Sequence, residues 1–347
     1  MKIVVTGTRG IPGIQGGVET HCEELYPLIW DEQHEIIVVC RPEYAVNPRM
    51  KSYKNVRIKD VWAPKGKHLE AFLHTFLAIL YARKINADVV HIHAVGPALF
   101  SPLARLLGMK VIVTHHGADY DRAKWSKMAK TILKLGERAA AHYANHFIVV
   151  SETMRLMLCQ QYPSCKNISL IPNGVNKPIK ESDIGYLHQL HLTEKKYVLA
   201  VGRLVEEKEF DKLIEAFKRL QPNSWKLVIA GSAPSDAYVQ KLYAACEGFE
   251  QIQLLGFVEK SKLAQLYAHT GLFVLPSLHE GLPIALLEAM SYNCPVLASD
   301  IPANLEVRLP EMCYFRAGNL DALQEGIKKR ITGNQLSEIS YDLSAYN

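Results

Sequence analysis

The second half of the chain carries a strand–loop–helix pattern, Leu272-Phe273-Val274-Leu275 and then, after four further residues, Glu280-Gly281-Leu282-Pro283-Ile284-Ala285-Leu286-Leu287-Glu288. The four apolar residues predict a buried strand, a Gly-Pro loop carries the first glutamate, and a helix carries the second. The amino terminus of such a helix binds phosphate, and carboxylates can accept hydrogen bonds from hydroxyl groups. The pattern predicts a site for a ligand with both groups, such as a nucleotide-sugar. The alternative is a loop charge at Glu280 and a solvated helix residue at Glu288.

Short apolar runs alternate with helical stretches along the whole chain. Strands are predicted at 2–6, 35–40, 88–92, 110–114, 146–150, 168–171, 197–201, 226–230, 251–254, 271–275 and 295–298. Most of them are continuously apolar, as in parallel strands that are covered on both faces. The pattern predicts an α/β fold with two doubly wound, Rossmann-like domains. The polar segment 176–195 indicates the connection, so the domains are placed at 1–176 and 177–347.

The composition is that of an ordinary globular protein, with 347 residues, 48% hydrophobic and 22% charged. No basic-then-apolar leader precedes the first strand, and the longest apolar stretch, 69–82, is too short and too polar to span a bilayer. The seven cysteines show no CxxC spacing, which favours reduced thiols. We therefore expect a cytoplasmic protein, with a possible peripheral position at the inner face of the plasma membrane.

Positive charge is concentrated in the first half, where 22 Lys and Arg face 14 Asp and Glu, against 18 and 21 in the second half. Basic residues at helical spacing lie beside an apolar face; they are Lys127, Lys130, Lys134 and Arg138, with Trp125, Met128, Ile132 and Leu135. The preferred interpretation is a surface helix with its apolar face in the core. The alternative is a helix that rests on anionic lipid. No nucleic-acid module is recognised, and nucleic acid is not expected as a partner.

A glycine-rich loop follows the first predicted strand, from Gly7 to Gly17. Glycine lets the backbone approach a ligand closely, and exposed N–H groups bind anions. The spacing is neither a clean GxGxxG nor a Walker A loop, so it supports a dinucleotide site only weakly.

His116 follows the predicted strand 110–114, at the end where open α/β sheets bind ligands. Its imidazole can donate to a sugar hydroxyl or a phosphate, and the alternative is a turn without a ligand. Asp119 and Asp121 form an Asp-x-Asp triplet, but one carboxylate pair without further ligands is a thin basis for a metal site. We expect no metal and no other cofactor.

The second domain begins with Gly202-Arg203-Leu204-Val205-Glu206-Glu207-Lys208, directly after a strand. Arginine offers a planar fork to phosphate and lysine offers a point charge, so Arg203 and Lys208 suit a diphosphate. The alternative is salt bridging to the neighbouring glutamates.

In this order and spacing the sequence resembles the retaining family-4 glycosyltransferases of the GT-B fold, in which two Rossmann-like domains face a cleft. The landmarks lie at 16–19, 34–35, 116–119, 151–152, 172–175, 202–208, 256–258, 276–277, 280–288 and 295–300. The resemblance covers roughly residues 1–325. The extended turn 116–125 is similar to the branch that builds bacterial surface polysaccharides, including rhamnosyltransferase-like members.

The resemblance implies a role for each matching residue. Gly202, Arg203 and Lys208 would belong to the donor site, where the two cations would hold the diphosphate. Glu288 would bind the ribose. Glu280 and the backbone of Gly281, Leu282 and Pro283 would contact the donor sugar, with His116 near the reacting carbon. Gly16 and Gly17 would border the diphosphate or the acceptor, and Asp119 and Asn173 are further site positions. The implied partners are a nucleotide-sugar and a glycan or lipid-diphosphate-linked acceptor, with possible contact to an anionic membrane.

The implied reaction separates charge, because the sugar becomes positive as the diphosphate leaves. Preorganised cations and a helix amino terminus stabilise the leaving group without a metal. The chain offers no obvious second carboxylate for a double displacement. The mechanistic hypothesis is therefore a front-face substitution, in which a departing phosphate oxygen takes the acceptor proton.

Three positions depart from the family pattern. Glu209 stands where the family usually has glycine, and this change can shift the diphosphate loop. Asn293 also replaces a common glycine, but asparagine tolerates the left-handed backbone. The chain ends at Asn347, where family members usually continue into a helix that crosses to the first domain, so we expect this helix to be short or missing.

Two other functions stay open on the sequence alone. One is a different reaction on the same fold, such as a nucleotide-sugar epimerase or hydrolase, which would turn over donor without acceptor. The other is a catalytically weak binding or scaffold protein, which would bind donor without turnover.

Overall fold

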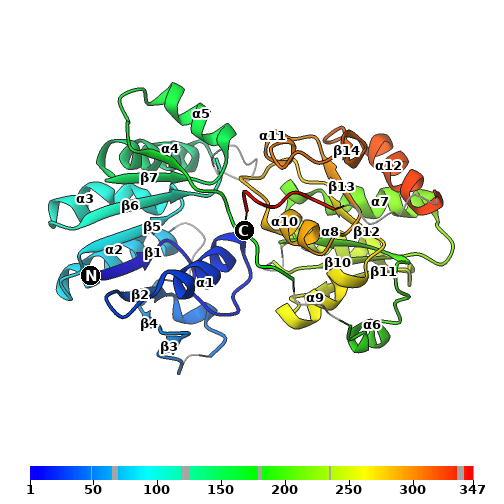
Figure 1. Ribbon diagram of the computed structural model, residues 1–347, viewed down its shortest axis with the longest axis horizontal. Helices are drawn as coiled ribbons and strands as arrows, with labels where there is room; N and C mark the ends of the chain where they lie inside the picture. The colour runs from blue at the N-terminus through cyan, green and yellow to red at the C-terminus, as the bar shows by residue number, and fades with distance from the viewer. Residues whose placement is uncertain are drawn as a thin grey trace. The chain divides into compact units, whose positions relative to one another are not determined.

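The computed structural model describes residues 1–47, 49–64, 69–118, 120, 126–178, 182–233, 236–333 and 340–346. The chain divides into two compact units, Met1–Pro172 and Asn173–Asn347. The sequence analysis placed the division at 176/177, whereas the structure places residues 173–176 with the second unit. Figure 1 shows each unit as a sheet with helices around it.

The first unit contains an eight-stranded sheet in the order β3-β4-β2-β1-β5-β6-β7-β8. All neighbouring strands are parallel except β3 and β4. The strands are β1 Lys2–Thr6, β2 Glu35–Cys40, β3 Ser52–Tyr53, β4 Val56–Asp60, β5 Val89–His93, β6 Lys110–His115, β7 His146–Val149 and β8 Ile168–Leu170. The α-helices are α1 Gly17–Ile29, α2 Leu69–Lys84, α3 Ser101–Leu106, α4 Lys127–Tyr143 and α5 Glu152–Gln161.

The second unit contains a six-stranded, wholly parallel sheet in the order β11-β10-β9-β12-β13-β14. In chain order within the unit this is 3-2-1-4-5-6, the Rossmann order. The strands are β9 Tyr197–Val201, β10 Lys226–Ala230, β11 Ile252–Gly256, β12 Leu272–Leu275, β13 Val296–Ser299 and β14 Tyr314–Phe315. The α-helices are α6 Gly185–Gln189, α7 Phe210–Leu220, α8 Ala237–Cys246, α9 Lys260–His269, α10 Ile284–Ser291, α11 Pro302–Leu305 and α12 Leu320–Thr332.

The central strands are buried because their side chains are apolar on both faces. All four apolar residues of β12 are buried, which confirms the interpretation of continuous apolar runs as covered parallel strands. All five residues of β5 are buried as well, two of them the histidines at 91 and 93. Strands β3, β4 and β14 were not predicted from the sequence. β4 lies next to the two-residue edge strand β3 and alternates apolar and charged residues, so its charged side chains stay outside the core. β3 and β14 have two residues each.

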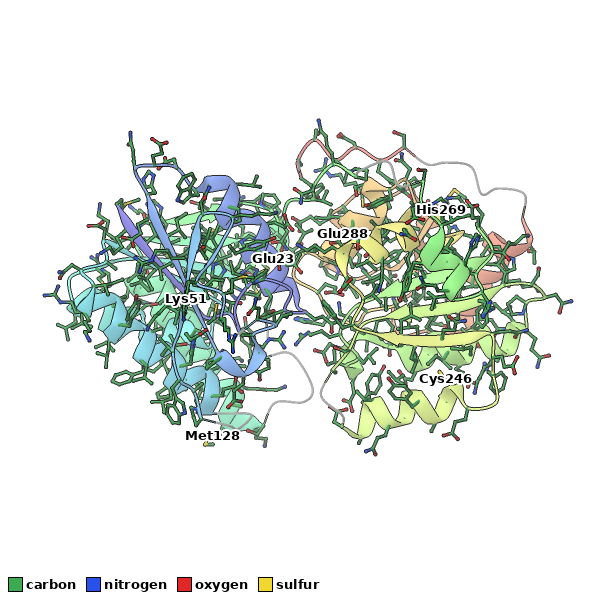
Figure 2. All side chains as sticks on the ribbon, turned by 90° about the horizontal axis from the view of Figure 1, so that it is seen from below. Glu23, Lys51, Met128, Cys246, His269 and Glu288 are labelled. Carbon is green, nitrogen blue, oxygen red and sulfur yellow. The ribbon has the colours of Figure 1, made fainter. Side chains whose placement is uncertain are left out.

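The apolar residues of α4 do not follow the preferred interpretation of this helix. Met128 is 75% exposed, and Ile132 and Leu135 are 40% and 48% exposed, whereas smaller residues further along the helix are buried. Figure 2 shows Met128 at the outer margin of the first unit. The buried face of α4 is formed by Gly136, Glu137 and the alanines at 139–141. The small side chains on this face allow the helix to lie close to its neighbours. Trp125 lies outside the described residues.

The remaining general expectations concern thiols, membrane spans and the end of the chain. All seven cysteines are free thiols, four of them buried. Across the described ranges, no helix combines the length and apolarity that a bilayer span requires. Residues 340–346 carry no helix; Tyr341 donates to the Cys294 carbonyl at 2.8 Å, and the Tyr346 carbonyl accepts from the Val175 amide at 2.8 Å.

Candidate functional site

Strands β9 and β12 are neighbours in the second sheet, so the loops at their carboxyl ends share one edge. This is the point where the strand order reverses, because β10 lies on one side of β9 and β12 on the other. Ligands of open α/β sheets bind outside the carboxyl ends of strands at such a point. The sequence analysis placed Gly202, Arg203, Lys208 and Glu280 in these two loops, and the structure brings the loops together.

Lys208 and Glu280 form an ion pair between the two loops. Their side chains are 15% and 11% exposed, so the pair is largely removed from water. The backbone also joins the loops, because the Leu278 amide donates to the Glu207 carbonyl at 2.9 Å. Gly202 lies under the Lys208 stem, since an added Cβ would approach Lys208 Cε to 3.5 Å. Arg203 is half-buried on the same edge.

Helix α10 begins at Ile284 directly after the Glu280 loop. No side chain caps its amino terminus, and the positive end of the helix dipole therefore lies beside the ion pair. The buried Asn173 holds the loop from beneath, because its Nδ2 donates to the Leu282 carbonyl at 2.9 Å. Gly281 is half-buried and Pro283 is buried in the same loop.

Glu288 is half-buried on α10 and accepts from the Tyr267 hydroxyl at 2.9 Å. Burial raises the pKa of Tyr267 well above its usual value, and the adjacent Glu288 carboxylate raises it further. Tyr267 therefore stays protonated and orients the carboxylate. The alternative of a freely solvated helix residue does not describe this position.

Glu209 closes the loop after Lys208 with a left-handed backbone, φ 49° and ψ 35°. Only glycine adopts this conformation without a steric cost from Cβ. Glu209 is buried and its carboxylate pairs with Lys212 at 2.5 Å. The backbone thus gives a physical reason why glycine suits this position.

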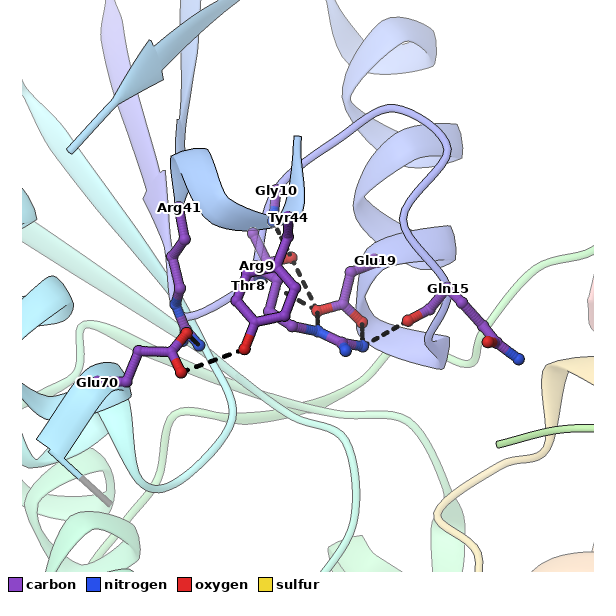
Figure 3. A network of polar contacts seen from close by, with 8 residues as sticks. All are labelled: Thr8, Arg9, Gly10, Gln15, Glu19, Arg41, Tyr44 and Glu70. Atoms are coloured by element: carbon purple, nitrogen blue, oxygen red, sulfur yellow. Dashed lines mark hydrogen bonds and ion pairs between the residues drawn. The ribbon is translucent and has the colours of Figure 1, made fainter. Parts of the chain in front are cut away.

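In the first unit, the glycine-rich loop after β1 folds around Arg9 and Glu19 (Figure 3). The Glu19 carboxylate accepts from the Arg9 backbone amide and from its Nε, both at 3.1 Å, and Arg9 also donates to the Gln15 carbonyl. Burial raises the pKa of the Glu19 carboxyl, but Arg9 lowers it below its ordinary value overall. The sequence analysis quoted Glu19 only as a landmark and missed Arg9.

The two glycines of this loop have different surroundings. Gly16 has φ 150°, and an added Cβ would overlap Glu19 Oε2 and come within 2.6 Å of Arg9 Nη2. At Gly17 an added Cβ would meet no atom within 4 Å. Gly16 is therefore required by the fold, whereas Gly17 leaves open space at the start of α1.

His116 lies at the end of β6 among other aromatic rings of the first unit. His93 Nδ1 is 2.8 Å from His116 Nε2, and His93 Nε2 is 2.6 Å from the Tyr26 hydroxyl. The same hydroxyl is 2.8 Å from His91 Nδ1. His91 Nε2 is in turn 2.8 Å from the Thr114 hydroxyl.

The sequence analysis found His116 but none of its partners. The signal for two of them was present, because His91 and His93 are two positions apart and therefore share one face of β5. Tyr26 comes from α1, and no local pattern indicates that its hydroxyl would lie between the two rings.

Burial keeps these rings neutral at physiological pH. It lowers the pKa of His91 to about 3, with a further contribution from His21. It also holds the pKa of His93 and His116 well below the usual value, again with neighbouring histidines adding to the effect. An edge of neutral rings can donate and accept hydrogen bonds without carrying net charge.

His115 points to a different set of partners. Its Nε2 is 3.0 Å from the Glu137 carboxylate of α4, which also accepts from the Tyr120 hydroxyl at 2.8 Å and from the Tyr162 hydroxyl at 3.1 Å. His115 and Glu137 are fully buried. This anchor fixes the end of β6, and hence the backbone that carries His116.

Ring nitrogens of His21, His93 and His116 lie within 4.8 Å of one another, which is a possible arrangement for a metal ion. The hydrogen bonds oppose it, because both nitrogens of His93 and Nε2 of His116 are already engaged. A metal would have to replace those bonds. Asp119 and Asp121 lie outside the described residues.

Both halves of the chain match known families. Residues 15–177 match "Glycosyltransferase Family 4", and residues 188–341 match "Glycosyl transferases group 1". An uncharacterized glycosyltransferase of Methanocaldococcus jannaschii is 25% identical over 351 residues, covering 95% of this chain and 88% of the relative. The UDP-Gal:alpha-D-GlcNAc-diphosphoundecaprenol alpha-1,3-galactosyltransferase of Escherichia coli is 25% identical over 320 residues, covering 87% and 81%.

Solved structures share the fold at low sequence identity. Sucrose-phosphate synthase from Thermosynechococcus elongatus aligns with a TM-score of 0.81 and 19% identity, covering 97% of this chain and 91% of the other. The Anabaena protein HepE, solved with UDP-glucose, aligns with a TM-score of 0.79 and 18% identity, covering 97% and 92%. These likenesses confirm the predicted α/β fold with two Rossmann-like domains.

Proposed function

This chain belongs to the glycosyltransferases of the GT-B fold, and we propose that it moves a sugar from a nucleotide-diphosphate donor to a hydroxyl group of a glycan or lipid-linked acceptor. The observation that carries the proposal is the Lys208–Glu280 ion pair beside the uncapped amino terminus of α10, at the reversal point of the second sheet. This arrangement offers positive charge to a diphosphate and a carboxylate to sugar hydroxyls.

The donor would lie across the two loops of the second unit. Arg203 and Lys208 bind the diphosphate together with the backbone N–H groups that begin α10. Glu280 and the Gly281–Pro283 backbone bind the sugar. Glu288, which Tyr267 orients, binds the ribose. HepE was solved with UDP-glucose, which supports a donor of this class.

The reaction transfers the sugar with retention of configuration. Positive charge develops on the sugar while negative charge develops on the diphosphate, and the cations of the second unit stabilise the latter without a metal. The acceptor hydroxyl attacks from the face that the diphosphate leaves, and a phosphate oxygen takes the acceptor proton. A covalent sugar–protein adduct trapped during turnover would contradict this front-face step.

The acceptor is a polyprenyl-diphosphate-linked or otherwise anionic glycan at a membrane surface. The α4 face supports this assignment, because exposed Met128, Ile132 and Leu135 lie on the same helix as Lys127, Lys130 and Lys134. Apolar side chains can enter the headgroup region while lysines contact anionic lipid. The Escherichia coli relative is named for a diphosphoundecaprenol acceptor, and an amylovoran biosynthesis glycosyltransferase of Erwinia amylovora is also related. We place the chain in surface-polysaccharide synthesis of the rhamnosyltransferase-like branch.

A thermal-shift screen with UDP-, GDP-, dTDP- and ADP-sugars, without metal, tests donor binding. A ligand that binds only the folded protein adds about 2.7 kcal/mol of stability at 100 times its Kd. We expect a shift with one nucleotide class, lost in Arg203→Ala and kept in Lys241→Ala. Lys241 is a matched control because it forms a solvent-exposed pair with Asp211 in the same unit. A shift that survives Arg203→Ala would overturn the site.

Vesicle flotation tests the membrane assignment. Wild-type protein should float with anionic vesicles at low salt and not with neutral ones. Replacing Lys127, Lys130 and Lys134 together by glutamine should abolish flotation. Equal flotation of the variant, or none of the wild type, would reject a role for α4.

A further inference from the structure

A continuous line of five polar groups, four of them buried and the last, His116, half-buried, leads from Thr114 to His116 in the first unit. The contacts run from Thr114 Oγ1 to His91 Nε2, from His91 Nδ1 to the Tyr26 hydroxyl, from that hydroxyl to His93 Nε2, and from His93 Nδ1 to His116 Nε2. All four separations lie between 2.6 and 2.8 Å. Each of them is a hydrogen bond, and each requires one proton and one lone pair.

The number of protons leaves three arrangements. A neutral imidazole has one N–H donor and one lone-pair nitrogen, so a ring that turns its donor around forces the next group to turn as well. A hydroxyl has one proton but can accept two hydrogen bonds, so Tyr26 alone can accept from both sides. The protons therefore all point towards His116, all point away from it, or converge on Tyr26 from both rings.

Buried hydroxyl protons decide among the three. If the protons converge on Tyr26, its own proton has no acceptor among the described residues, and Tyr26 is fully buried. If the protons point towards His116, the Thr114 hydroxyl donates to His91 and every donor in the line has an acceptor. If they point away, His91 donates to Thr114, whose own proton then has no acceptor among the described residues. Thr114 is 1% exposed, so water does not replace that acceptor, and an unpaired buried donor costs about 1–3 kcal/mol. The shorter Tyr26–His93 contact also suits an O–H donor towards His93.

We propose that Tyr26, His91, His93 and Thr114 are positioning residues that fix His116 as the tautomer with its proton on Nδ1. His93 donates to Nε2 of His116, and the remaining proton lies on the nitrogen that the line leaves free. The consequence for transfer rests on the proposed function and on the contact with the donor sugar that the family resemblance implies for His116. His116 then acts as a neutral hydrogen-bond donor to a sugar or phosphate oxygen and not as a general base.

A fixed, neutral donor suits the charge that develops in the reaction. A positively charged ring would repel the sugar as it becomes positive, whereas a neutral ring binds its oxygens without that cost. A wrong histidine tautomer alone can cost an enzyme several orders of magnitude in rate, because the group then offers a lone pair where a proton is needed. The same hydrogen bonds leave His93 without a free lone pair, which opposes metal binding at the His21–His93–His116 cluster.

Thr114 provides the sharpest test because it lies four hydrogen bonds from His116. Thr114→Val removes the hydroxyl at nearly constant shape, and Thr114→Ser restores it. Long-range ¹⁵N–¹H NMR of the full-length protein without ligand reports which nitrogen of His116 carries the proton, with His116→Gln to assign the signal. Wild type and Thr114→Ser should show a single tautomer protonated on Nδ1. Thr114→Val should show a mixture, and its kcat should fall about 10-fold, at the low end for outer-shell partners.

Two results would overturn the inference. One is wild-type His116 protonated on Nε2 or present as a mixture, and the other is a Thr114→Val spectrum identical to that of wild type. A tautomer change in Thr114→Val without a change in kcat would support the hydrogen-bond line and overturn the role of His116 in transfer. Tyr26→Phe should act like Thr114→Val, whereas Tyr53→Phe, which removes a hydroxyl that donates to Glu23 at 3.5 Å and takes no part in the line, should leave the spectrum unchanged.

Discussion

The carboxyl ends of β5 and β6 in the first sheet and of β9 and β12 in the second use opposite kinds of chemistry. In the first unit these ends carry the histidine rings of His91, His93 and His116, and burial lowers their pKa so far that they stay neutral. In the second unit the loops beyond β9 and β12 carry a lysine and a glutamate as an ion pair. Both edges belong to sheets of the same doubly wound type, so the contrast comes from the side chains and not from the architecture.

The contrast fits the glycosyl transfer that we propose. In that reaction the leaving diphosphate needs fixed positive charge, which the second unit would supply. The sugar, which becomes positive, needs hydrogen bonds without added positive charge, which neutral rings would supply. The two edges are therefore expected to respond differently to substitution and to pH, and the predictions below separate them.

Loss of charge in the second unit should have the largest effect. Lys208→Met and Glu280→Gln should each lower kcat/KM on the order of 10²–10³-fold, because each removes a preorganised charge from the reacting diphosphate and sugar. The double variant should be about as slow as either single variant, since the two residues act as one unit. Steady-state transfer assays measure all three, with Lys241→Ala as the control.

The ion pair also changes the stability expected for these variants. Breaking a buried pair leaves the remaining charge unpaired and costs about 3–5 kcal/mol, so a single variant should unfold at a lower temperature than the neutral double variant. Additive losses of rate in the double variant would show that Lys208 and Glu280 act independently.

The neutral edge should make the first unit sensitive to acid. His91 has a pKa of about 3 in the folded state, against about 6.5 in an unfolded chain. Between these values the unfolded state binds a proton that the folded state excludes, so stability falls as pH falls below about 6.5. The slope is about 1.4 kcal/mol per pH unit for each such ring, and His93 and His116 act in the same direction.

Calorimetry from pH 7.5 to pH 4.5 measures this slope. His91→Asn removes one titrating ring. The slope of the unfolding free energy against pH should therefore fall by the share of one proton, about 1.4 kcal/mol per pH unit, even if the variant is less stable at pH 7. A slope identical to that of wild type would mean that His91 is already charged in the folded state.

Gly16 and Gly17, in the loop after β1, separate an effect on stability from an effect on transfer. Both effects should be smaller than those of the charged residues. Gly16→Ala should destabilise the first unit by about 2 kcal/mol, because the new methyl group overlaps the Glu19 carboxylate at a backbone conformation that disfavours Cβ. Gly17→Ala meets no neighbour, so its melting temperature should match wild type. If a ligand approaches the backbone here, the Gly17→Ala variant should transfer sugar at least about tenfold more slowly than wild type. A fully active Gly17→Ala would show that the loop does not border a ligand.

The sequence predicts the second edge better than the first because its residues lie in two short loops. Arg203, Lys208 and Glu280 each lie in the loop that follows an apolar strand, and neighbouring parallel strands bring such loops together. The pairing of Lys208 with Glu280 could not be predicted from the sequence, because charge type and position alone do not distinguish an ion pair from two separate ligand contacts.

The arrangement of side chains at the first edge could not be predicted from the sequence, because it depends on tertiary contacts. Tyr26 lies on α1, His91 and His93 on β5, and His116 at the end of β6. Only the register of β5 and β6, which pairs His93 with Thr114, places these groups in one line. The preferred interpretation of α4, with its apolar face in the core, was wrong for a related reason: periodicity identifies a face but not what covers it.

Glu209 offers the smallest effect and tests how finely the charged edge is tuned. Its left-handed backbone costs about 1 kcal/mol relative to glycine, so Glu209→Gly should relieve strain beside Lys208. The same change removes the 2.5 Å pair with Lys212 and gives the unfolded chain more freedom. These terms nearly cancel, and we expect a change in unfolding free energy below about 1 kcal/mol and a change in kcat of less than about threefold. Glu209→Ala is the matched control, because it removes the same pair and keeps the strain. A Glu209→Gly variant that is many times faster than wild type would show that Glu209 holds the diphosphate loop away from its productive position.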